Sequence, residues 1–445
     1  MKRLLLLAPL AALFVACNVA PTPTPAPTAT CACPTCAPTA TTRPTRTPTP
    51  EPATATPAPT WDGSGFKRNA APELIGICQG DGSHGAGGNN WYYVSGQSLA
   101  WRFIEPMAGT YNFSAPDPGG YLGQAPIPAV ATVTALDAKN QAAGREPFYL
   151  WLQLAWWSPG NDWIPAWAQI ERLPYVGNPG DGTFPNPFDA RIVTAMRPAI
   201  AEMARRWNSE PRVSAFLAYL GEYGEMNVKY VCAKDTPGTK SDCGSEPDNV
   251  LIQAAIKRVK AETGETVTPA QMIASYPDAS GVAWQHRWQR ELFIYFVKPM
   301  IEMYAAAWTK TPIVIQLGNM SEWHFGNAHC GANEAGVTCA SLAEKVAEYA
   351  STWDGRVWLK QNGLGNSSTG AYAVLMGKYS NRTRVIWEPG STTPDGDKLN
   401  AAINVGKASA TCYQSWLIDG GMSIPLTTQK AMLRDNYMAT YWSKP

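Results

Sequence analysis

The stretch RVIWEPG, residues Arg384–Gly390, is the part of the chain that best indicates its fold. An apolar β-forming run, Val385–Trp387, ends in the carboxylate of Glu388, and the Pro-Gly pair that follows stops a strand. A carboxylate at the tip of a buried strand is costly to desolvate unless it has partners or takes part in chemistry. The rest of the chain contains further runs of this kind.

Eight β-like runs follow one another, and most are separated by segments with helical periodicity. The runs are Leu74–Cys78, Leu99–Ile104, Phe148–Trp156, Val213–Leu220, Ile313–Leu317, Val357–Lys360, Arg384–Trp387 and Tyr413–Ile418. Strands that alternate with helices predict a parallel sheet, and eight of them predict a closed (β/α)8 barrel, the TIM barrel. We expect this catalytic domain to span residues 61–445.

The clearest helical pattern lies between Phe188 and Trp207, where apolar residues recur every three or four positions. A second helical segment is predicted over Trp284–Trp308, with a kink at Pro299. The first crossover, Asp81–Gln97, is rich in Gly and Asn and shows no helical pattern.

The amino-acid composition indicates which kinds of binding partner to expect. The 36 Lys and Arg residues nearly balance the 35 Asp and Glu residues, which gives no electrostatic reason to expect nucleic acid. The 18 tryptophans are unusual, because Trp is large and usually only partly buried. Some of them are candidates for flat platforms under sugar rings.

The N-terminal segment resembles a bacterial export signal. Residues 1–17 combine a basic start with an apolar run too short to span a membrane in the mature protein. The ending Val15-Ala16-Cys17 resembles a lipobox, which implies that Cys17 is lipidated and anchors the chain to a membrane. Because Phe14 replaces the usual Leu, plain secretion and a retained anchor remain alternatives. Each of these readings predicts a cell-surface or secreted, extracellular protein.

Residues 18–60 are almost all Pro, Thr and Ala, so this segment is predicted to be a disordered, semi-stiff spacer. Cys31, Cys33 and Cys36 interrupt it, and we expect disulfides there because neither a His nor a fourth Cys completes a metal site. In the barrel, two close cysteine pairs predict local disulfides in an exported protein: Cys232 with Cys243, and Cys330 with Cys339. Cys78 and Cys412 fall on the first and last strands, but at opposite ends of their runs, so no bond is expected between them.

Active sites of TIM barrels lie at the carboxyl ends of the strands, so the residues that end the runs are candidate site residues. The acidic candidates are Glu388 and, after the fourth run, Glu222 and Glu225; Glu105 is more often a structural ion-pair partner. Cleavage of a glycosidic bond requires at least two carboxyl groups, and two at one rim of the barrel would meet this requirement. The predicted substrate-binding residues are Arg102, Trp156, Trp157, Asn319, Gln361, Asn362 and Trp416. Among these, Arg102 is a candidate to keep a nucleophilic carboxylate ionised.

Several short motifs carry a family resemblance. The segment WRFIEPMAGTYNFS, Trp101–Ser114, resembles the second-strand pattern of β-galactosidase-like barrels, and IPAWA, Ile164–Ala168, resembles the Pro-x-Trp after their third strand. GEYGE, Gly221–Glu225, resembles their fourth-strand Asn-Glu-Tyr-Gly, with Gly221 in place of Asn, and RVIWEPG is similar to their nucleophile segment. The chain thus resembles clan A retaining glycoside hydrolases, with family forty-two as a distant relative.

This resemblance implies an enzyme that cleaves β-glycosidic bonds of an oligo- or polysaccharide by double displacement, without cofactor or metal. It implies that Glu388 is the nucleophile and that a fourth-strand Glu is the acid/base. One alignment of the motif selects Glu222, and a Gly-x-Trp-Gly-Glu pattern in related barrels selects Glu225. Both remain candidates.

Two other functions are open at this stage. The first is a catalytically inactive, carbohydrate-binding lipoprotein on the same barrel. The second is metal-dependent hydrolysis through His324 and His329, which lack a third ligand and a helix. Neither a Gly-rich phosphate loop nor a Gly-x-Ser-x-Gly elbow occurs, which argues against nucleotide and esterase chemistry.

Overall fold

The computed structural model describes residues 77–78, 94–113, 149–158, 161–174, 183–210, 213–221, 226, 249–317, 339–364, 371–379, 382–383, 385–389 and 410–414. The chain divides into two compact units, Met1–Pro59 and Thr60–Pro445. All described residues belong to the second unit, so the predicted signal segment, Cys17 and the spacer lie outside them.

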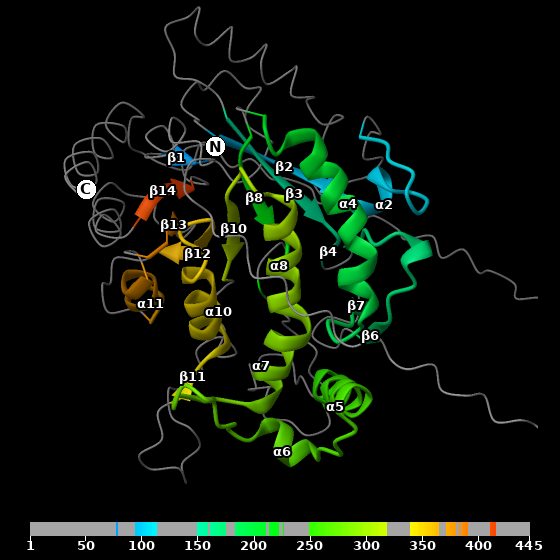
Figure 1. Ribbon diagram of the computed structural model, residues 1–445, viewed down its shortest axis with the longest axis vertical. Helices are drawn as coiled ribbons and strands as arrows, with labels where there is room; N and C mark the ends of the chain where they lie inside the picture. The colour runs from blue at the N-terminus through cyan, green and yellow to red at the C-terminus, as the bar shows by residue number, and fades with distance from the viewer. Residues whose placement is uncertain are drawn as a thin grey trace, which may run out of the picture. The chain divides into compact units, whose positions relative to one another are not determined.

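Parallel strands form the main sheet of the described chain (Figure 1). These strands are β1 (Ile77–Cys78), β2 (Val94–Ala100), β3 (Tyr149–Ala155), β8 (Val213–Ala218), β10 (Ile313–Gln316), β12 (Val357–Leu364), β13 (Val385–Pro389) and β14 (Ala410–Gln414). They pair in the order β1-β14-β13-β12-β10-β8-β3-β2, and β1 also pairs with β2, so the pairings form a closed barrel. The predicted α/β class with a parallel sheet is confirmed, and each of the eight predicted runs overlaps one of these strands.

Several strand boundaries differ from the prediction, and β12 continues to Leu364, four residues beyond the predicted end at Lys360. The strand predicted at Leu99–Ile104 begins instead at Val94, inside the predicted first crossover, and Trp101–Ile104 forms the short helix α2. Trp101 and Ile104 are both buried, and their three-residue spacing fits one face of a helical turn. The last strand, predicted at Tyr413–Ile418, is β14 at Ala410–Gln414. Cys78 is registered with Gln414, two positions beyond Cys412, and the side chains of both cysteines lie outside the described part of the structure.

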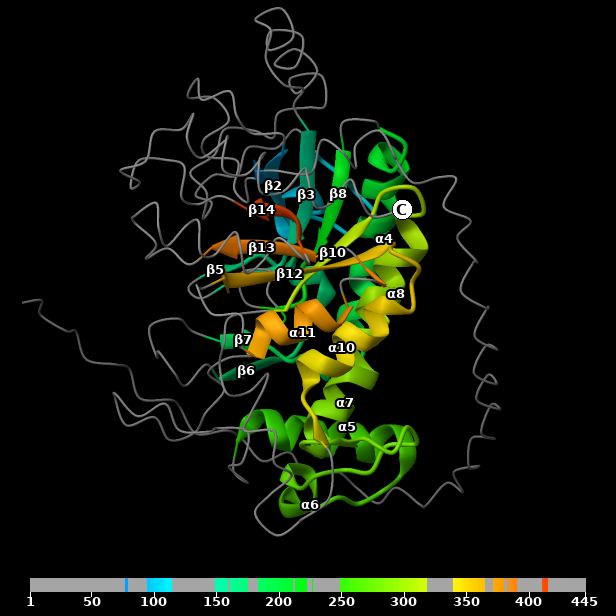
Figure 2. The same cartoon turned by 90° about the vertical axis from the view of Figure 1, so that its left-hand side faces the viewer.

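The described helices lie on one side of the strands and below them in the view of Figure 2. They are α4 (Arg191–Trp207), α5 (Val250–Thr263), α6 (Pro269–Ile273), α7 (Arg287–Leu292), α8 (Lys298–Ala307), α10 (Leu342–Ser351) and α11 (Ala371–Tyr379). Helix α8 packs on α4 and β8, whereas α10 and α11 pack on β12. Side-chain caps start three of them: Asn249 accepts from the Leu251 N–H, Thr268 forms a capping box with Gln271, and Ser341 forms one with Glu344. Within the described residues, no helix is both long and apolar enough to cross a membrane.

The predicted helix over Trp284–Trp308 begins only at Arg287, and from there helical turns of different types continue past Pro299. Trp284 lies in the two-residue strand β9 (Ala283–Trp284), and helix α7 begins at Arg287. A π-helical turn, η6 (Phe293–Val297), joins α7 to α8 just before the proline. A π turn shifts the hydrogen-bond pattern by one residue, so it accommodates the missing N–H of a proline at the start of the next helical segment.

Three two-stranded pairs lie outside the barrel in the described chain. They join β4 (Trp157–Ser158) to β5 (Asn161–Asp162), β6 (Arg172–Pro174) to β7 (Thr183–Pro185), and β9 to β11 (Cys339–Ala340). A 3-10 turn, η2 (Ala166–Ala168), follows β5. The β9–β11 pair connects the chain between β8 and β10 with the chain between β10 and β12.

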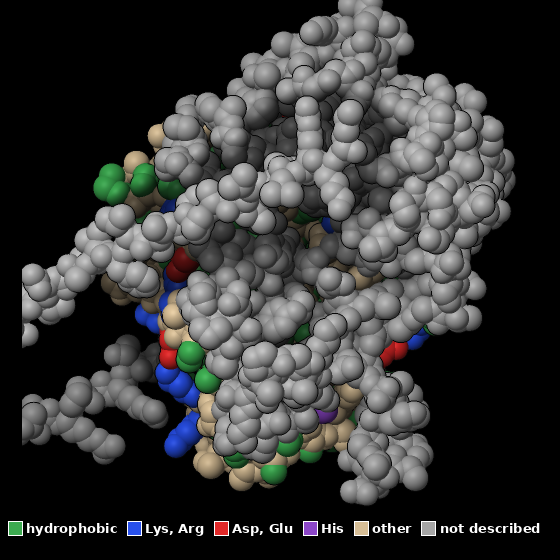
Figure 3. Space-filling view, turned by 180° about the vertical axis from the view of Figure 1, so that it is seen from behind, with side chains coloured by type: hydrophobic (Ala, Val, Ile, Leu, Met, Phe, Trp, Pro, Cys, Tyr) green, Lys and Arg blue, Asp and Glu red, His purple; other side chains and the backbone are tan. Residues whose placement is uncertain are grey.

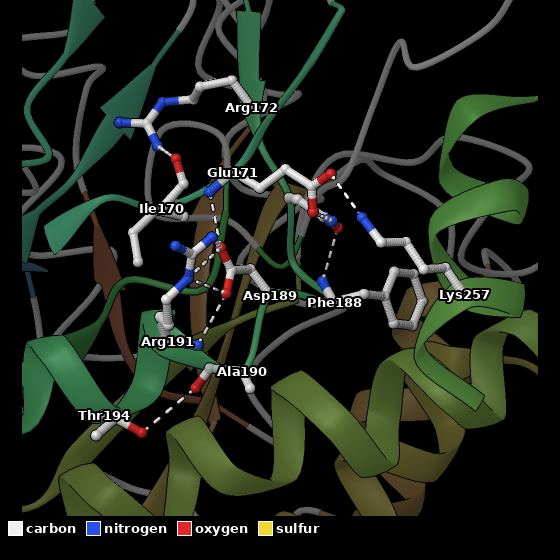
Figure 4. A network of polar contacts seen from close by, with 10 residues as sticks. Ile170, Glu171, Arg172, Phe188, Asp189, Ala190, Arg191, Thr194 and Lys257 are labelled. Carbon is white, nitrogen blue, oxygen red and sulfur yellow. Dashed lines mark hydrogen bonds and ion pairs between the residues drawn. The ribbon is translucent and has the colours of Figure 1, made fainter. Parts of the chain in front are cut away.

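A polar network fixes the start of α4, which begins at Arg191 rather than at the predicted Phe188 (Figure 4). The Asp189 carboxylate accepts from the Glu171 N–H at 2.7 Å and from the Arg191 guanidinium at 2.7 Å. Burial opposes ionisation of Asp189, but these hydrogen bonds outweigh it and lower the pKa of the carboxyl group. Lys257 on α5 adds an ion pair with Glu171. Figure 3 shows acidic and basic side chains close together along one edge of the described surface.

The two faces of the strands are distinguished by Phe216 of β8. Its ring stacks on Trp308 at 4.4 Å and lies against Tyr304 of α8 at 5.4 Å, so it faces the helices. Phe216 is registered with Ile313 of β10. Because side chains alternate along a strand, Ile313 and Ile315 face the helices, whereas Val314 and Gln316 face the barrel interior.

Candidate functional site

The carboxyl ends of β12 and β13 lie side by side. Lys360 is registered with Ile386, and two positions further along Asn362 is registered with Glu388. Glu388 is the fourth residue of a strand that continues to Pro389, so it lies within the strand rather than beyond its tip. The backbone thus places two predicted site residues, Asn362 and Glu388, next to each other. Their side chains lie outside the described part of the structure.

A buried lysine lies in the barrel interior below these positions. Lys360 of β12 is registered with Gln316 of β10, and its Nζ donates to Gln316 Oε1 at 2.6 Å. The two residues are 2% and 7% exposed, respectively. A buried cation is costly unless charges and hydrogen bonds compensate for it, so the hydrogen bond from Gln316 helps Lys360 to be accommodated inside the barrel. The sequence analysis missed Lys360, although a lysine at the end of the apolar run VWLK was a visible signal.

The chain after β8 also reaches this region. The backbone N–H of Met226 donates to the Gln316 carbonyl at the end of β10 at 2.7 Å. Neighbouring strands lie about 4.8 Å apart, so a contact on β10 is about 10 Å from β13 across the sheet. Met226 follows directly after Glu225 in the sequence.

Gln361 was predicted to bind substrate, and its position contradicts that role. Leu359 belongs to the hydrophobic core that the strands share with the helices, and Gln361 lies two residues further along β12. Alternation therefore puts Gln361 on the helix-facing side, where it is fully buried. Lys360, between Leu359 and Gln361, therefore lies on the interior face of β12.

Trp156 and Trp157 were predicted to be sugar platforms, but both rings are buried in packing contacts. Trp156 donates to the Tyr219 carbonyl at 2.8 Å and lies edge-on against Phe296. Trp157 donates to the Thr183 carbonyl at 2.9 Å and lies edge-on against Phe184 at 4.8 Å. With their faces covered and their N–H groups used, these residues form the wall beside the strand ends.

Arg102 lies on α2 and is exposed. Its Nη1 donates to the Asp162 carbonyl at 2.8 Å, and its guanidinium lies 4.6 Å from the Phe103 ring. The hydrogen bond to Asp162 attaches α2 to β5.

Glu105, the other acidic residue near β2, is fully buried and has a structural role, as the sequence analysis favoured. It accepts from Trp101 Nε1 at 2.8 Å and from the Gly109 N–H at 2.9 Å. Burial, reinforced by the charge of Glu105, raises the pKa of Tyr111 to about 12. Glu105 thus holds the turn after α2 together.

The remaining predicted site residues lie outside the described residues. They are Glu222, Glu225, Asn319, Trp416, the possible ligands His324 and His329, and the paired cysteines Cys232, Cys243 and Cys330; Cys339 is described by its backbone in β11 only. Among the described residues, no cluster of three or more His, Cys, Asp or Glu side chains is arranged to hold a metal ion.

No family model and no curated protein matches this chain. Solved structures similar to it include endo-glycoceramidase II from Rhodococcus sp., at 10% sequence identity over 80% of this chain and 78% of that chain, with a TM-score of 0.32. They also include β-galactosidase from Bacillus circulans sp. alkalophilus, at 12% identity over 73% of this chain and 46% of that chain, with a TM-score of 0.34. A family 39 glycoside hydrolase from Bacteroides cellulosilyticus WH2 is 11% identical over 80% of this chain and 59% of that chain, with a TM-score of 0.24.

The described site thus has two layers on the interior face of β10, β12 and β13. The lower layer is the Lys360–Gln316 hydrogen bond, and the upper layer contains positions 362 and 388 at the strand ends.

Proposed function

We propose that this protein is an extracellular retaining glycoside hydrolase that cleaves β-glycosidic bonds by double displacement, with Glu388 as the nucleophile. The observation that supports this most is the register of β12 and β13, which puts Glu388 opposite Asn362 at the strand ends above Lys360. A TIM barrel forms its active site at this end of its strands. The substrate is an oligo- or polysaccharide, and the reaction needs neither metal nor cofactor.

The second carboxyl group comes from the segment after β8. Glu222 and Glu225 are the two candidates for the acid/base, and we favour Glu225. The backbone contact of the next residue, Met226, with the end of β10 supports this choice, because β10 is only two strands from β13. In a retaining enzyme the two carboxyl groups stand about 5–5.5 Å apart.

Each carboxyl group has a separate task. Glu388 attacks the anomeric carbon as a carboxylate, while the acid/base holds a proton for the leaving oxygen, which requires a raised pKa. Water then cleaves the glycosyl-enzyme ester with the acid/base acting as a base, so the product keeps the anomeric configuration.

The first test is hydrolysis of a panel of aryl β-glycosides by the wild type, Glu388→Gln and Glu262→Gln. Glu262 is an exposed helix residue paired with Arg258, so its variant is a matched control. We expect the wild type and the control to be equally active and Glu388→Gln to be at background. Proton NMR of the first product should show the β-anomer; an α-anomer would contradict the retaining mechanism. Equal background rates for all three proteins, together with glycan binding, would favour the inactive carbohydrate-binding lipoprotein.

The second test separates Glu222 from Glu225. Replacing the acid/base by Gln should slow glycosides with poor leaving groups far more than activated aryl glycosides, because only poor leaving groups need the proton. Added azide should restore the rate of that variant and yield a β-glycosyl azide. We expect this pattern for Glu225→Gln; the same pattern for Glu222→Gln alone would reverse the assignment.

We further propose that the chain is exported and anchored through a lipid on Cys17. The support is the lipobox-like ending of residues 1–17 followed by the Pro/Thr-rich spacer. Metabolic labelling with a fatty acid should mark the wild type but not Cys17→Ala. A labelled Cys17→Ala protein, or an unlabelled wild type in the culture medium, would contradict lipidation at this residue.

A further inference from the structure

We infer that Trp167, Asp162 and Arg102 form a carbohydrate-binding subsite on the rim of the barrel, separate from the strand-end positions of Glu388 and Asn362. The inference rests on the proposed function, because it assigns a place to a sugar unit beyond the bond that is cleaved. Trp167 belongs to the IPAWA motif, and the sequence analysis gave it no role.

The three residues lie at the carboxyl ends of two neighbouring barrel strands. Arg102 belongs to α2, which starts directly after β2. Asp162 ends β5 in the connection that follows β3, and Trp167 lies in the turn η2 just beyond it. A TIM barrel places its active site at this end of its strands. In the order of the described barrel strands β3 stands four places from β13, so the subsite lies across the mouth of the barrel from the end of β13.

Contacts with the segment after β2 hold Trp167 in one orientation. Its Nε1 donates to the Glu105 carbonyl at 3.0 Å, and its ring lies edge-to-face with that of Trp101, with 5.8 Å between the ring centroids. The Arg102 N–H donates to the Trp163 carbonyl at 2.7 Å, which joins α2 to the same connection. Trp167 is only partly buried. A ring that is already fixed loses little conformational entropy when a sugar stacks on it.

Polar groups for sugar hydroxyls lie in the same cluster of contacts. The Asp162 carboxylate, whose side chain is 39% exposed, accepts from the Ile164 N–H at 3.0 Å and from Arg172 Nε at 2.8 Å. A carboxylate has about four lone-pair sites, so these two bonds leave acceptor capacity open to solvent. The exposed guanidinium of Arg102 donates to the Asp162 carbonyl at 2.8 Å and has further N–H groups. An acceptor and a donor therefore lie side by side on the rim.

This combination of groups suits a sugar better than an anion or an apolar ligand. A pyranose ring has an apolar C–H face for an aromatic ring, and adjacent hydroxyls that each donate and accept hydrogen bonds. An anion such as phosphate would be repelled by the Asp162 carboxylate, which already pairs with Arg172. An apolar ligand would cover these polar groups without replacing their hydrogen bonds to water.

The test measures the binding of β-linked gluco-, galacto- and xylo-oligosaccharides by isothermal titration calorimetry. Glu388→Gln serves as the background, so that the ligand is not cleaved, and the Kd of the disaccharide is compared with that of the hexasaccharide in each series. We expect Trp167→Ala to raise the Kd of the hexasaccharide about fivefold and Asp162→Asn to raise it about threefold. The Kd of the disaccharide should change less, because a short ligand does not reach across the mouth of the barrel.

Trp353→Ala is the matched control and should leave both Kd values unchanged. Trp353 is also only partly buried, and its ring lies against Tyr349 and 5.6 Å from the Arg356 guanidinium. It lies between the end of α10 and the start of β12, at the opposite end of the barrel from the subsite.

Urea unfolding of each variant separates a structural role from a binding role. A folded Trp167→Ala protein whose Kd for the hexasaccharide equals that of the background would make Trp167 a purely structural residue and would overturn the subsite. If Trp167→Ala does not fold, Asp162→Asn decides alone, because Asn keeps an acceptor for the Ile164 N–H. An unchanged Kd for the hexasaccharide in Asp162→Asn would then overturn the subsite.

The outcomes also separate the subsite from the proposed function. Suppose that the wild type cleaves aryl β-glycosides and Glu388→Gln does not. Equal Kd values for disaccharide and hexasaccharide, or no binding in any of the three series, would then overturn the subsite alone. A wild type that cleaves no glycoside, but binds the hexasaccharide through Trp167, would overturn the hydrolase and keep the subsite as part of a carbohydrate-binding lipoprotein.

Discussion

Replacing Glu105 by Ala should strongly destabilise the protein, because this fully buried carboxylate accepts hydrogen bonds from a buried indole N–H and from a backbone N–H. The donors are Trp101 Nε1 at 2.8 Å and the Gly109 N–H at 2.9 Å. A hydrogen bond to a charged group contributes about 1.5–3 kcal/mol, so losing both should lower the free energy of unfolding by about 3–6 kcal/mol. Native proteins have only about 5–15 kcal/mol in total, so this is a large fraction.

Tyr111 provides a second, local readout of the same change. Its pKa is raised to about 12, first by burial and then by the charge and hydrogen bond of Glu105. Glu105→Ala should therefore lower this pKa, but not to the ordinary value, because burial remains. The difference between the ultraviolet tyrosinate titrations of wild type and variant, measured below the onset of unfolding, isolates this residue.

Urea unfolding followed by tryptophan fluorescence measures the stability change. Glu262→Ala, which removes an exposed carboxylate paired with Arg258, is the control and should cost less than about 1 kcal/mol. A loss in Glu105→Ala no greater than in the control, with an unchanged Tyr111 titration, would refute the structural role of Glu105. A kcat loss at full stability would instead make it a site residue.

Three further predictions concern the core, the site wall and the surface. Phe216→Ala removes a buried ring stacked on Trp308 and should cost about 3–5 kcal/mol in urea unfolding; a loss below about 1 kcal/mol would contradict the packing. Trp156→Phe removes the hydrogen bond to the Tyr219 carbonyl and should cost about 1 kcal/mol without changing KM for a glycoside, whereas a higher KM would restore the sugar-platform role. The pKa of Glu202 is lowered to about 2, chiefly by its hydrogen bond from Arg205, so its contribution is complete above its ordinary pKa of 4.5 and is lost as the pH falls toward 2. Glu202→Gln should therefore reduce the loss of stability on acidification, and an unchanged acid dependence would show that the Arg205 and Arg206 pairs do not contribute.

The strands were predictable because a buried strand appears in the sequence as an apolar, β-forming run bounded by turn residues. The ends of the strands were harder to predict. The sequence of Leu99–Ile104 fits a buried strand, yet Trp101 and Ile104 form a helical turn whose stability depends on Glu105 and on the Trp163 carbonyl, which accepts from the Arg102 N–H. A local sequence pattern cannot show contacts with residues about 60 positions away.

The site was predictable only where one strand determines it. RVIWEPG alone predicts that Glu388 lies near the carboxyl end of a strand, and β13 contains it as the fourth of its five residues. Which neighbours share its face depends on pairing with β12, so Gln361 was assigned to the wrong side and Lys360 was missed. The partner that makes a buried Lys360 tolerable, Gln316, is 44 residues away.

The short β9–β11 pair has a consequence for changes in loop length. It hydrogen-bonds the insertion that follows the fourth barrel strand to the chain that follows the fifth, outside the barrel itself. Neither connection can be shortened or exchanged independently, since losing one edge leaves the other with unpaired backbone groups. Chimeras that graft rim loops from other barrels onto this scaffold should therefore replace both connections together, as a single unit.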